Sequence, residues 1–160
     1  MTVRVAMWSG PRNISTALMR SWENRPDTVV VDEPFYASYL DRTGLEHPAR
    51  AEILASQPTA YDDVARSLTA PVDAAVLYAK LMTHHLADDD DLAWVAPLRN
   101  VLLIRDPAEV VASYVRSREA CEPADIGLLQ QERLATALPD TPVIDAADFL
   151  RDPAAYLRWL

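Results

Sequence analysis

Short apolar, β-branched runs alternate along the chain with stretches in which apolar residues recur at helical spacing. The runs predict strands over residues 3–8, 28–32, 74–80, 101–104 and 141–145. After the first run, Leu18, Met19 and Trp22 fall on one face of a predicted helix. This alternation predicts an α/β fold with three layers, in which a parallel sheet is flanked by helices on both faces.

The remaining pattern predicts several helices, some of which are interrupted by glycine or proline. Residues 35–68 are mostly helical but are interrupted by Gly44, Pro48 and Pro58, and we expect a lid or an acceptor pocket there. A further helix is expected over 125–138, and a last one over 149–160 with a possible break before Pro153. Because the sequence stops inside this apolar helix without a cap, we expect the fold to continue beyond Leu160.

The first predicted strand leads into the loop Gly10-Pro11-Arg12-Asn13-Ile14-Ser15-Thr16. A strand, a tight loop and a helix direct unpaired backbone N–H groups and the positive helix end at one point, which suits a phosphate or a sulfate. Arg12 adds a permanent positive charge there, and the hydroxyl of Ser15 or Thr16 can cap the helix. A Walker A loop would carry a lysine that this loop lacks. The alternative is a plain turn in which Gly10 and Pro11 only reverse the chain.

Two carboxylates, Asp32 and Glu33, end the second strand, which we expect to be buried. Ligands of open α/β sheets bind at the carboxyl ends of the strands, so either carboxylate is a candidate general base or metal-binding acid. The alternative is an acidic strand end that only contacts solvent.

A second motif begins where the strand 101–104, expected to be fully buried, delivers Arg105 at its carboxyl end. Asp106 is a good N-cap, Pro107 suits the first helical position, and Glu109 would complete a capping box.

In the helix that follows, we expect Val110, Val111, Tyr114 and Val115 to form the buried stripe and to leave Ser113 on its flank. Arg105 and Ser113 can then converge on one anion. Alternatively, Arg105 pairs with Asp106 or Asp32.

The histidines and the acidic run give weaker indications. His84 and His85 are adjacent and point in different directions, so they are not expected to share a metal, although one of them could act as an acid or base. The run 88–91 of four aspartates is expected to be a solvated turn. No metal site is predicted.

Composition limits the remaining possibilities. A chain of 160 residues, half of them hydrophobic, predicts a single globular domain over 1–160. Its net charge of −9 argues against a nucleic-acid partner. The single Cys121 fits a reducing compartment, and neither a membrane-spanning run nor a signal peptide is evident. We therefore expect a cytoplasmic protein with a small-molecule partner; the oligomeric state is left open.

The two motifs, in this order, resemble those of the sulfotransferase family, enzymes with a P-loop type of nucleotide-binding fold that use 3′-phosphoadenosine 5′-phosphosulfate. The family's first loop, Pro-Lys/Arg-Ser-Gly-Thr-Thr, is similar to residues 11–16 here. Its second motif, an arginine at a strand end with a serine eight positions later, is similar to Arg105 and Ser113. The resemblance covers residues 1–120 well and the remainder weakly.

The resemblance implies that the loop 10–16 binds the 5′-phosphosulfate, with Arg12 between the phosphate and the sulfuryl group and with Ser15 and Thr16 on the same phosphate. It implies that Arg105 and Ser113 hold the 3′-phosphate, and that a base accepts the proton of a hydroxyl or amine acceptor. Some bacterial members are thought to use a glutamate after the second strand, which favours Glu33 as the base, with His84 second. On this resemblance, we expect the family's glycine-rich, basic C-terminal segment to be missing from the domain.

Two other functions remain open. One is a P-loop kinase or nucleotide hydrolase in which Asp32 holds Mg²⁺. The other is a non-catalytic nucleotide-binding module, which the missing C-terminal segment favours.

Overall fold

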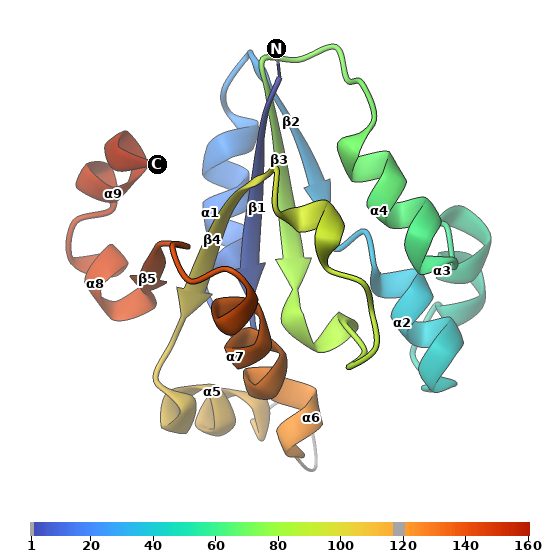
Figure 1. The fold of residues 1–160 in the computed structure, drawn as a ribbon. Coiled ribbons are helices and arrows are strands. Elements are labelled where there is room, and N and C mark those ends of the chain that lie inside the picture. The colour runs from blue at the N-terminus through green and yellow to red at the C-terminus, as the bar shows by residue number, and fades with distance from the viewer. Residues whose placement is uncertain (1, 117–120) are drawn as a thin grey trace.

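The sheet at the centre of the molecule has five parallel strands in the order β2-β3-β1-β4-β5 (Figure 1). The structure is a computed structural model that describes residues 2–116 and 121–160. The strands are β1 (Val3–Ser9), β2 (Thr28–Asp32), β3 (Val76–Met82), β4 (Arg99–Ile104) and β5 (Val143–Asp145). The predicted α/β class and each predicted strand are therefore confirmed.

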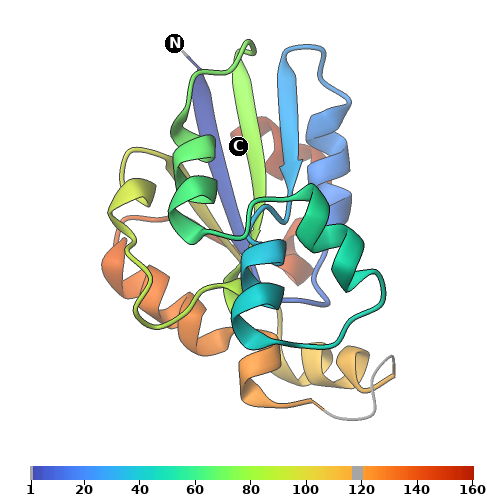
Figure 2. The same cartoon turned by 90° about the vertical axis from the view of Figure 1, so that its right-hand side faces the viewer.

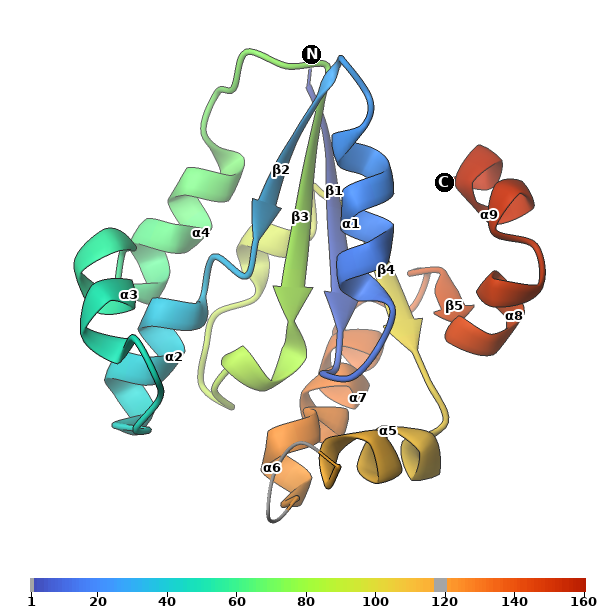
Figure 3. The ribbon, with the colours of Figure 1, turned by 180° about the vertical axis from the view of Figure 1, so that it is seen from behind.

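Helices connect the strands and lie on both faces of the sheet. They are α1 (Ser15–Glu23), α2 (Tyr36–Thr43), α3 (Arg50–Ser56), α4 (Tyr61–Thr69), α5 (Pro107–Tyr114), α6 (Pro123–Ile126), α7 (Leu128–Ala137), α8 (Ala146–Arg151) and α9 (Pro153–Trp159), with 3-10 turns η1 (Thr83–His85) and η2 (Ala93–Val95). Helix α1 lies on one side of the sheet, with α8 and α9 on the same side near β5 (Figure 3), and α4 and α7 lie on the other side (Figure 2). Helices α2 and α3 lie beside the β2 edge of the sheet (Figures 1 and 3).

Each face of the sheet has its own hydrophobic core, because side chains alternate along a strand. From β1, Val5 and Met7 join a cluster with residues of α1 and α8. Ala6 and Trp8 join the opposite cluster, with residues of α4 and α7. Strand β1 is therefore buried on both faces, which explains its continuous apolar run.

Strand β1 lies between β3 and β4, so its carboxyl end is at the centre of one edge of the sheet. Ser9, the last residue of β1, is in register with Met82 of β3 and Leu103 of β4. Helices α5 and α6 lie beyond this edge, beneath the arrowheads in Figures 1 and 3. The loops that follow β1 to β4 therefore open toward one region, which is where α/β proteins bind ligands.

Several boundaries differ from the sequence predictions. Strand β2 is an edge strand, and Val29 is 42% exposed, so the expectation of a buried second strand is wrong. The strand expected to be fully buried ends at Ile104, which is 36% exposed. The helix expected over 125–138 is divided into α6 and α7 by Gly127, which adopts a positive φ of 64°. The last helix does break before Pro153.

Within residues 2–116 and 121–160, no helix is long and apolar enough to cross a membrane.

Candidate active site

The loop after β1 is held by its own polar side chains. Arg12 has a left-handed backbone, with φ of 57°, which is uncommon for a residue with a side chain. The Asn13 side chain accepts a hydrogen bond from the Ile14 N–H at 2.8 Å and donates one to the Leu103 carbonyl at 3.2 Å. These bonds attach the loop to β4 and fix the point from which the Arg12 side chain leaves.

The first turn of α1 differs from the expected capping arrangement. Ile14 occupies the N-cap position, and among the described residues no side chain caps this turn, so the expectation of a cap from Ser15 or Thr16 is wrong. Ser15 is buried and Thr16 is exposed. Because backbone N–H groups at a helix start are available to an anion when no side chain occupies them, the turn keeps its capacity for phosphate.

Gly10 allows the loop to approach α6 closely. A Cβ atom at this position would lie 2.7 Å from the Ile126 carbonyl oxygen. A side chain would therefore push the loop and α6 apart, which accounts for the glycine in physical terms.

Arg105 and Ser113 meet the loop from the other side. The Arg12 Nε donates a hydrogen bond to the Ser113 Oγ at 3.1 Å, and an Arg105 guanidinium nitrogen donates one to the Arg12 carbonyl at 2.8 Å. Ser113 is only 8% exposed. Two turns separated by more than ninety residues are thus joined through these three residues.

The start of α5 shows which of its expected contacts form. Asp106 caps the helix by accepting from the Ala108 N–H at 2.8 Å, and Pro107 is the first helical residue, both as predicted. Glu109 does not complete a capping box; its carboxylate pairs with the Arg105 Nε at 3.0 Å. The partner of Arg105 is therefore neither Asp106 nor Asp32, the two that sequence reasoning offered.

The buried face of α5 is also different from the expected stripe. Val111 and Val115 are 39% and 47% exposed, whereas Val110 and Ser113 are buried. Helix α5 lies beyond the strand ends and not on a face of the sheet (Figures 1 and 3), so only one narrow side of it meets the protein. That geometry turns Ser113 inward, toward Arg12.

Glu33, Asp32 and Lys80 form a compact charged group beside the loop. The Lys80 Nζ lies 2.7 Å from the Asp32 Oδ1 and 2.6 Å from the Glu33 Oε1. Lys80 is 4% exposed, while the Asp32 and Glu33 side chains are 48% and 31% exposed. Burial alone lowers the pKa of Lys80, but the hydrogen bonds and charges of the two carboxylates outweigh it and raise that pKa above its ordinary value. Lys80 is therefore a cation at neutral pH.

Glu33 and Lys80, but not Asp32, line one cavity of about 400 Å³ at the carboxyl edge of the sheet, together with the loop after β1. Its lining consists of Pro11, Arg12, Asn13, Ser15, Thr16, Glu33, Lys80, Met82, Arg105 and Ser113. Of the residues singled out from the sequence, Gly10 and Ile14 support the loop from outside the lining, and His84 does not line the cavity either. Lys80 and Met82 line it although no site role was predicted for them.

His84 and His85 pack into an aromatic cluster instead. Their ring centroids are 4.4 Å apart, and the rings of Tyr36 and Tyr39 stack on His85 at 5.2 and 5.0 Å. Burial lowers the pKa of His84 to about 4. The pKa of His85 is also lowered, mainly by burial and to a smaller extent by electrostatic interaction with His84, Lys80 and Arg42. Both rings are therefore neutral at pH 7.

The aspartate run 88–91 is partly structural. Asp90 accepts a hydrogen bond from the Ala87 N–H at 2.6 Å and pairs with Arg42 at 3.1 Å. Across the described residues, no group of three or more His, Cys, Asp or Glu side chains is arranged to hold a metal ion.

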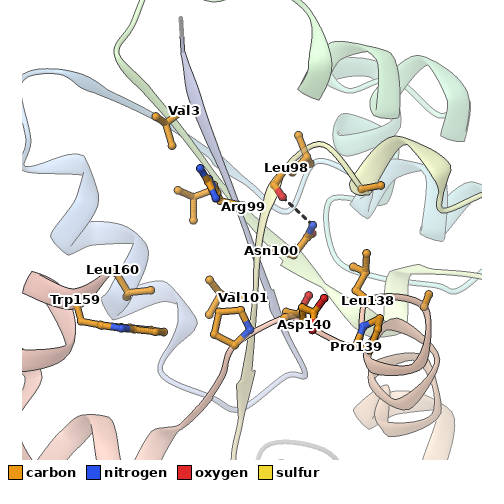
Figure 4. A pocket seen from close by; sticks show the side chains of 15 residues that line it. Val3, Leu98, Arg99, Asn100, Val101, Leu138, Pro139, Asp140, Trp159 and Leu160 are labelled. Atoms are coloured by element: carbon orange, nitrogen blue, oxygen red, sulfur yellow. Dashed lines mark hydrogen bonds between the residues drawn. The ribbon is translucent and has the colours of Figure 1, made fainter.

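A larger hollow, of about 730 Å³, lies at the opposite ends of the strands (Figure 4). Val3, Val101, Leu138 and Trp159 give it a largely apolar lining, with Arg99 as its single cation among the described residues. It lacks a cluster of anion-binding groups, so the smaller, more polar cavity is the better candidate site.

The chain is thus an α/β protein whose parallel sheet carries, at its carboxyl edge, a cavity lined by Arg12, Lys80 and Arg105. A family model described as the sulfotransferase domain matches residues 3–160. The chain therefore belongs to the sulfotransferase family, and the match includes the C-terminal part in which the motif resemblance is weak.

Two curated relatives come from Arabidopsis thaliana. Branched-chain-amino-acid aminotransferase-like protein 1 is 32% identical over 161 residues, and protein 2 is 31% identical over 165 residues. Each alignment covers 96% of this chain but 28% of the relative, so the chain spans little more than a quarter of their length. A crystal structure of a sulfotransferase from Alicyclobacillus acidocaldarius matches with a TM-score of 0.56 and 15% identity, over 96% of this chain and 77% of that one, which shows a shared fold.

Proposed function

We propose that the chain transfers a sulfuryl group from 3′-phosphoadenosine 5′-phosphosulfate to a hydroxyl or amine group of a small molecule. The observation that carries this proposal is the convergence of Arg12, Arg105 and Ser113 on one cavity beside the uncapped first turn of α1. A donor with two anionic ends needs two cationic positions, and the cavity offers Arg12 and Arg105 for them.

The proposed binding mode assigns one end of the donor to each turn. The 5′-phosphosulfate would lie against the loop 10–14 and the first turn of α1, where backbone N–H groups, Arg12, Ser15 and Thr16 are available. The 3′-phosphate would lie against Arg105 and Ser113. In this mode the donor displaces the Arg12–Ser113 hydrogen bond, and both side chains turn to its anionic oxygens.

The chemistry requires positioning, charge stabilisation and one proton acceptor. The acceptor oxygen or nitrogen attacks the sulfur while the bond from sulfur to the 5′-phosphate oxygen breaks, and the leaving phosphate keeps the electron pair. Arg12 stabilises the charge that develops on that phosphate. Glu33, which lines the cavity, takes the acceptor proton. His84 is a poorer candidate for this role because it lies outside the cavity lining.

The kinase or nucleotide-hydrolase alternative needs Asp32 as a Mg²⁺ ligand. Asp32 instead accepts a hydrogen bond from Lys80 at 2.7 Å, and a lysine ammonium at this distance competes with a metal cation. We therefore favour sulfuryl transfer, for which our proposal includes no metal.

The test is a transfer assay that measures conversion of the donor to 3′-phosphoadenosine 5′-phosphate with a panel of small hydroxyl and amine compounds. Arg12→Ala is expected to lower turnover by about 10²-fold or more. Glu33→Gln is expected to lower turnover by about 10²–10⁴-fold and to leave binding of the nucleotide product nearly unchanged.

Arg25→Ala provides a matched control, because Arg25 forms an exposed ion pair with Asp27 away from the cavity. Unchanged turnover in Arg12→Ala would contradict the site. Mg²⁺-dependent ATP hydrolysis without sulfuryl transfer would favour the kinase alternative, and no binding of either nucleotide would favour a non-catalytic module.

A further inference from the structure

Asp32 and Glu33 are neighbours in the sequence, yet both of their carboxylates contact the same atom, the Lys80 Nζ. In a regular strand, successive side chains point to opposite faces. Here Glu33 has a left-handed backbone with φ of 46°, immediately after β2 ends at Asp32. This turn brings both carboxylates within 2.7 Å of the Lys80 Nζ. A conformation that costs about 1–3 kcal/mol is thus retained at a cavity wall, a pattern common at functional sites.

The register of the sheet fixes the lysine in this position. Lys80 is paired with Asp32 across β3 and β2, and the Glu33 N–H donates to the Lys80 carbonyl at 3.0 Å. The Lys80 side chain is only 5% exposed, so its charge depends on nearby carboxylates. If Glu33 were the single partner, protonation of Glu33 would leave a buried ammonium without a counter-charge.

We propose that Asp32 is a positioning residue that keeps Lys80 neutralised while Glu33 accepts the proton of the acceptor. The inference rests on the proposed function. Before transfer, Lys80 is shared by two carboxylates. As the acceptor oxygen bonds to sulfur, its proton moves to a Glu33 carboxylate oxygen, and the sulfur-to-oxygen bond of the donor breaks with its electron pair on the 5′-phosphate. Asp32 then remains as the counter-ion of Lys80, so Glu33 is free to become neutral.

The charges around this group come from several elements. Arg12 and Arg105 line the same cavity as Glu33. Arg20 of α1 interacts electrostatically with Asp32, and His85 of η1 interacts electrostatically with Lys80. None of these groups can replace Asp32, because each of the arginines is a cation and His85 is neutral at pH 7. Asp32 is therefore the second anion that contacts Lys80.

The expected effect of Asp32→Asn follows from this charge balance. Loss of the Asp32 charge leaves Lys80 acting on Glu33 alone, which favours the ionised form of Glu33 and makes it a weaker base. The acid limb of the kcat/KM profile should move to lower pH by about one unit, and kcat should fall by about tenfold. Asp32→Glu, which retains a carboxylate, should restore the limb toward its wild-type position.

Binding of 3′-phosphoadenosine 5′-phosphate should stay within about twofold of wild type in the Asp32 variants, because Asp32 does not line the donor cavity. Asp27→Asn is the matched control: Asp27 precedes the same strand and pairs with exposed Arg25. Asp32→Ser, which also removes the charge, is measured in parallel so that a folding defect in one variant leaves the test intact.

Each result is decisive. An acid limb that stays in place in an active Asp32→Asn or Asp32→Ser enzyme would overturn the inference, as would a lower kcat without movement of the limb. Those outcomes would leave the proposed function standing. Absence of transfer by the wild-type protein would overturn the proposed function itself.

Discussion

The aromatic cluster around His84 predicts that the protein loses stability as the pH falls below about 6.5. The His84 Nδ1 is buried and has no hydrogen-bond partner among the described residues, and the ring lies against Tyr39 and His85. Burial lowers the pKa of His84 from 6.5 to about 4, and the charge of Asp125 opposes this shift only in part. Protonation therefore favours the unfolded chain.

The magnitude follows from the difference between the two states. The unfolded chain protonates His84 near pH 6.5 and the folded protein near pH 4, a difference of about 2.5 units. At about 1.4 kcal/mol per unit, the group contributes about 3 kcal/mol of stability above pH 6.5. This stability falls as the pH decreases, by about 2 kcal/mol between about pH 7 and about pH 4.5, because the unfolded state binds the proton first.

Urea denaturation at a series of pH values measures this directly. His84→Gln should be less stable at pH 7 but should lose about 2 kcal/mol less between about pH 7 and about pH 4.5 than the wild type does. His47→Gln is the control, because His47 contacts the same cluster from its edge and is less buried. An equal pH dependence in wild type and His84→Gln would refute the buried, neutral state of His84.

The glycines give two further predictions, one on the free energy of unfolding and one that includes nucleotide binding. Gly127→Ala should lower the free energy of unfolding by about 2–4 kcal/mol, because its Cβ would lie 2.6 Å from the His84 backbone nitrogen and from the Thr83 Oγ1. Gly44→Ala is the comparison: Gly44 has a similar positive φ but no atom near its Cβ position, so the free energy of unfolding should fall by about 1 kcal/mol. Gly10→Ala should weaken nucleotide binding as well as stability, since its Cβ would displace the loop from Ile126; unchanged binding would contradict the role of that contact.

The site motifs could be predicted from the sequence where local rules determine geometry. Arg105 follows an apolar strand, and Asp106 and Pro107 start a helix at a known position, so Ser113 falls a fixed distance along that helix. The loop at Arg12 follows from the strand-to-helix pattern in the same way. The family model and the sulfotransferase structure confirm the family and the fold that these motifs indicated.

The rest depends on contacts between distant segments. Lys80 lies in a strand where local rules disfavour a charge, and only the register of β3 against β2 shows that Asp32 and Glu33 neutralise it. Val111 and Val115 have the spacing of a buried stripe, but α5 lies beyond the strand ends and leaves them exposed. Sequence periodicity indicates that a helix has an apolar face, and the topology decides whether anything covers it.

The central claim is that Arg12 and Arg105 bind opposite ends of one doubly phosphorylated adenosine. Calorimetric titration with 3′-phosphoadenosine 5′-phosphate and with 5′-AMP, on the wild type and on Arg105→Ala, tests it most directly. We predict that the wild type prefers the bisphosphate and that Arg105→Ala weakens bisphosphate binding by about 10–100-fold while 5′-AMP binding changes little. Equal affinity of the wild type for both nucleotides, or an equal loss for both in Arg105→Ala, would contradict the claim.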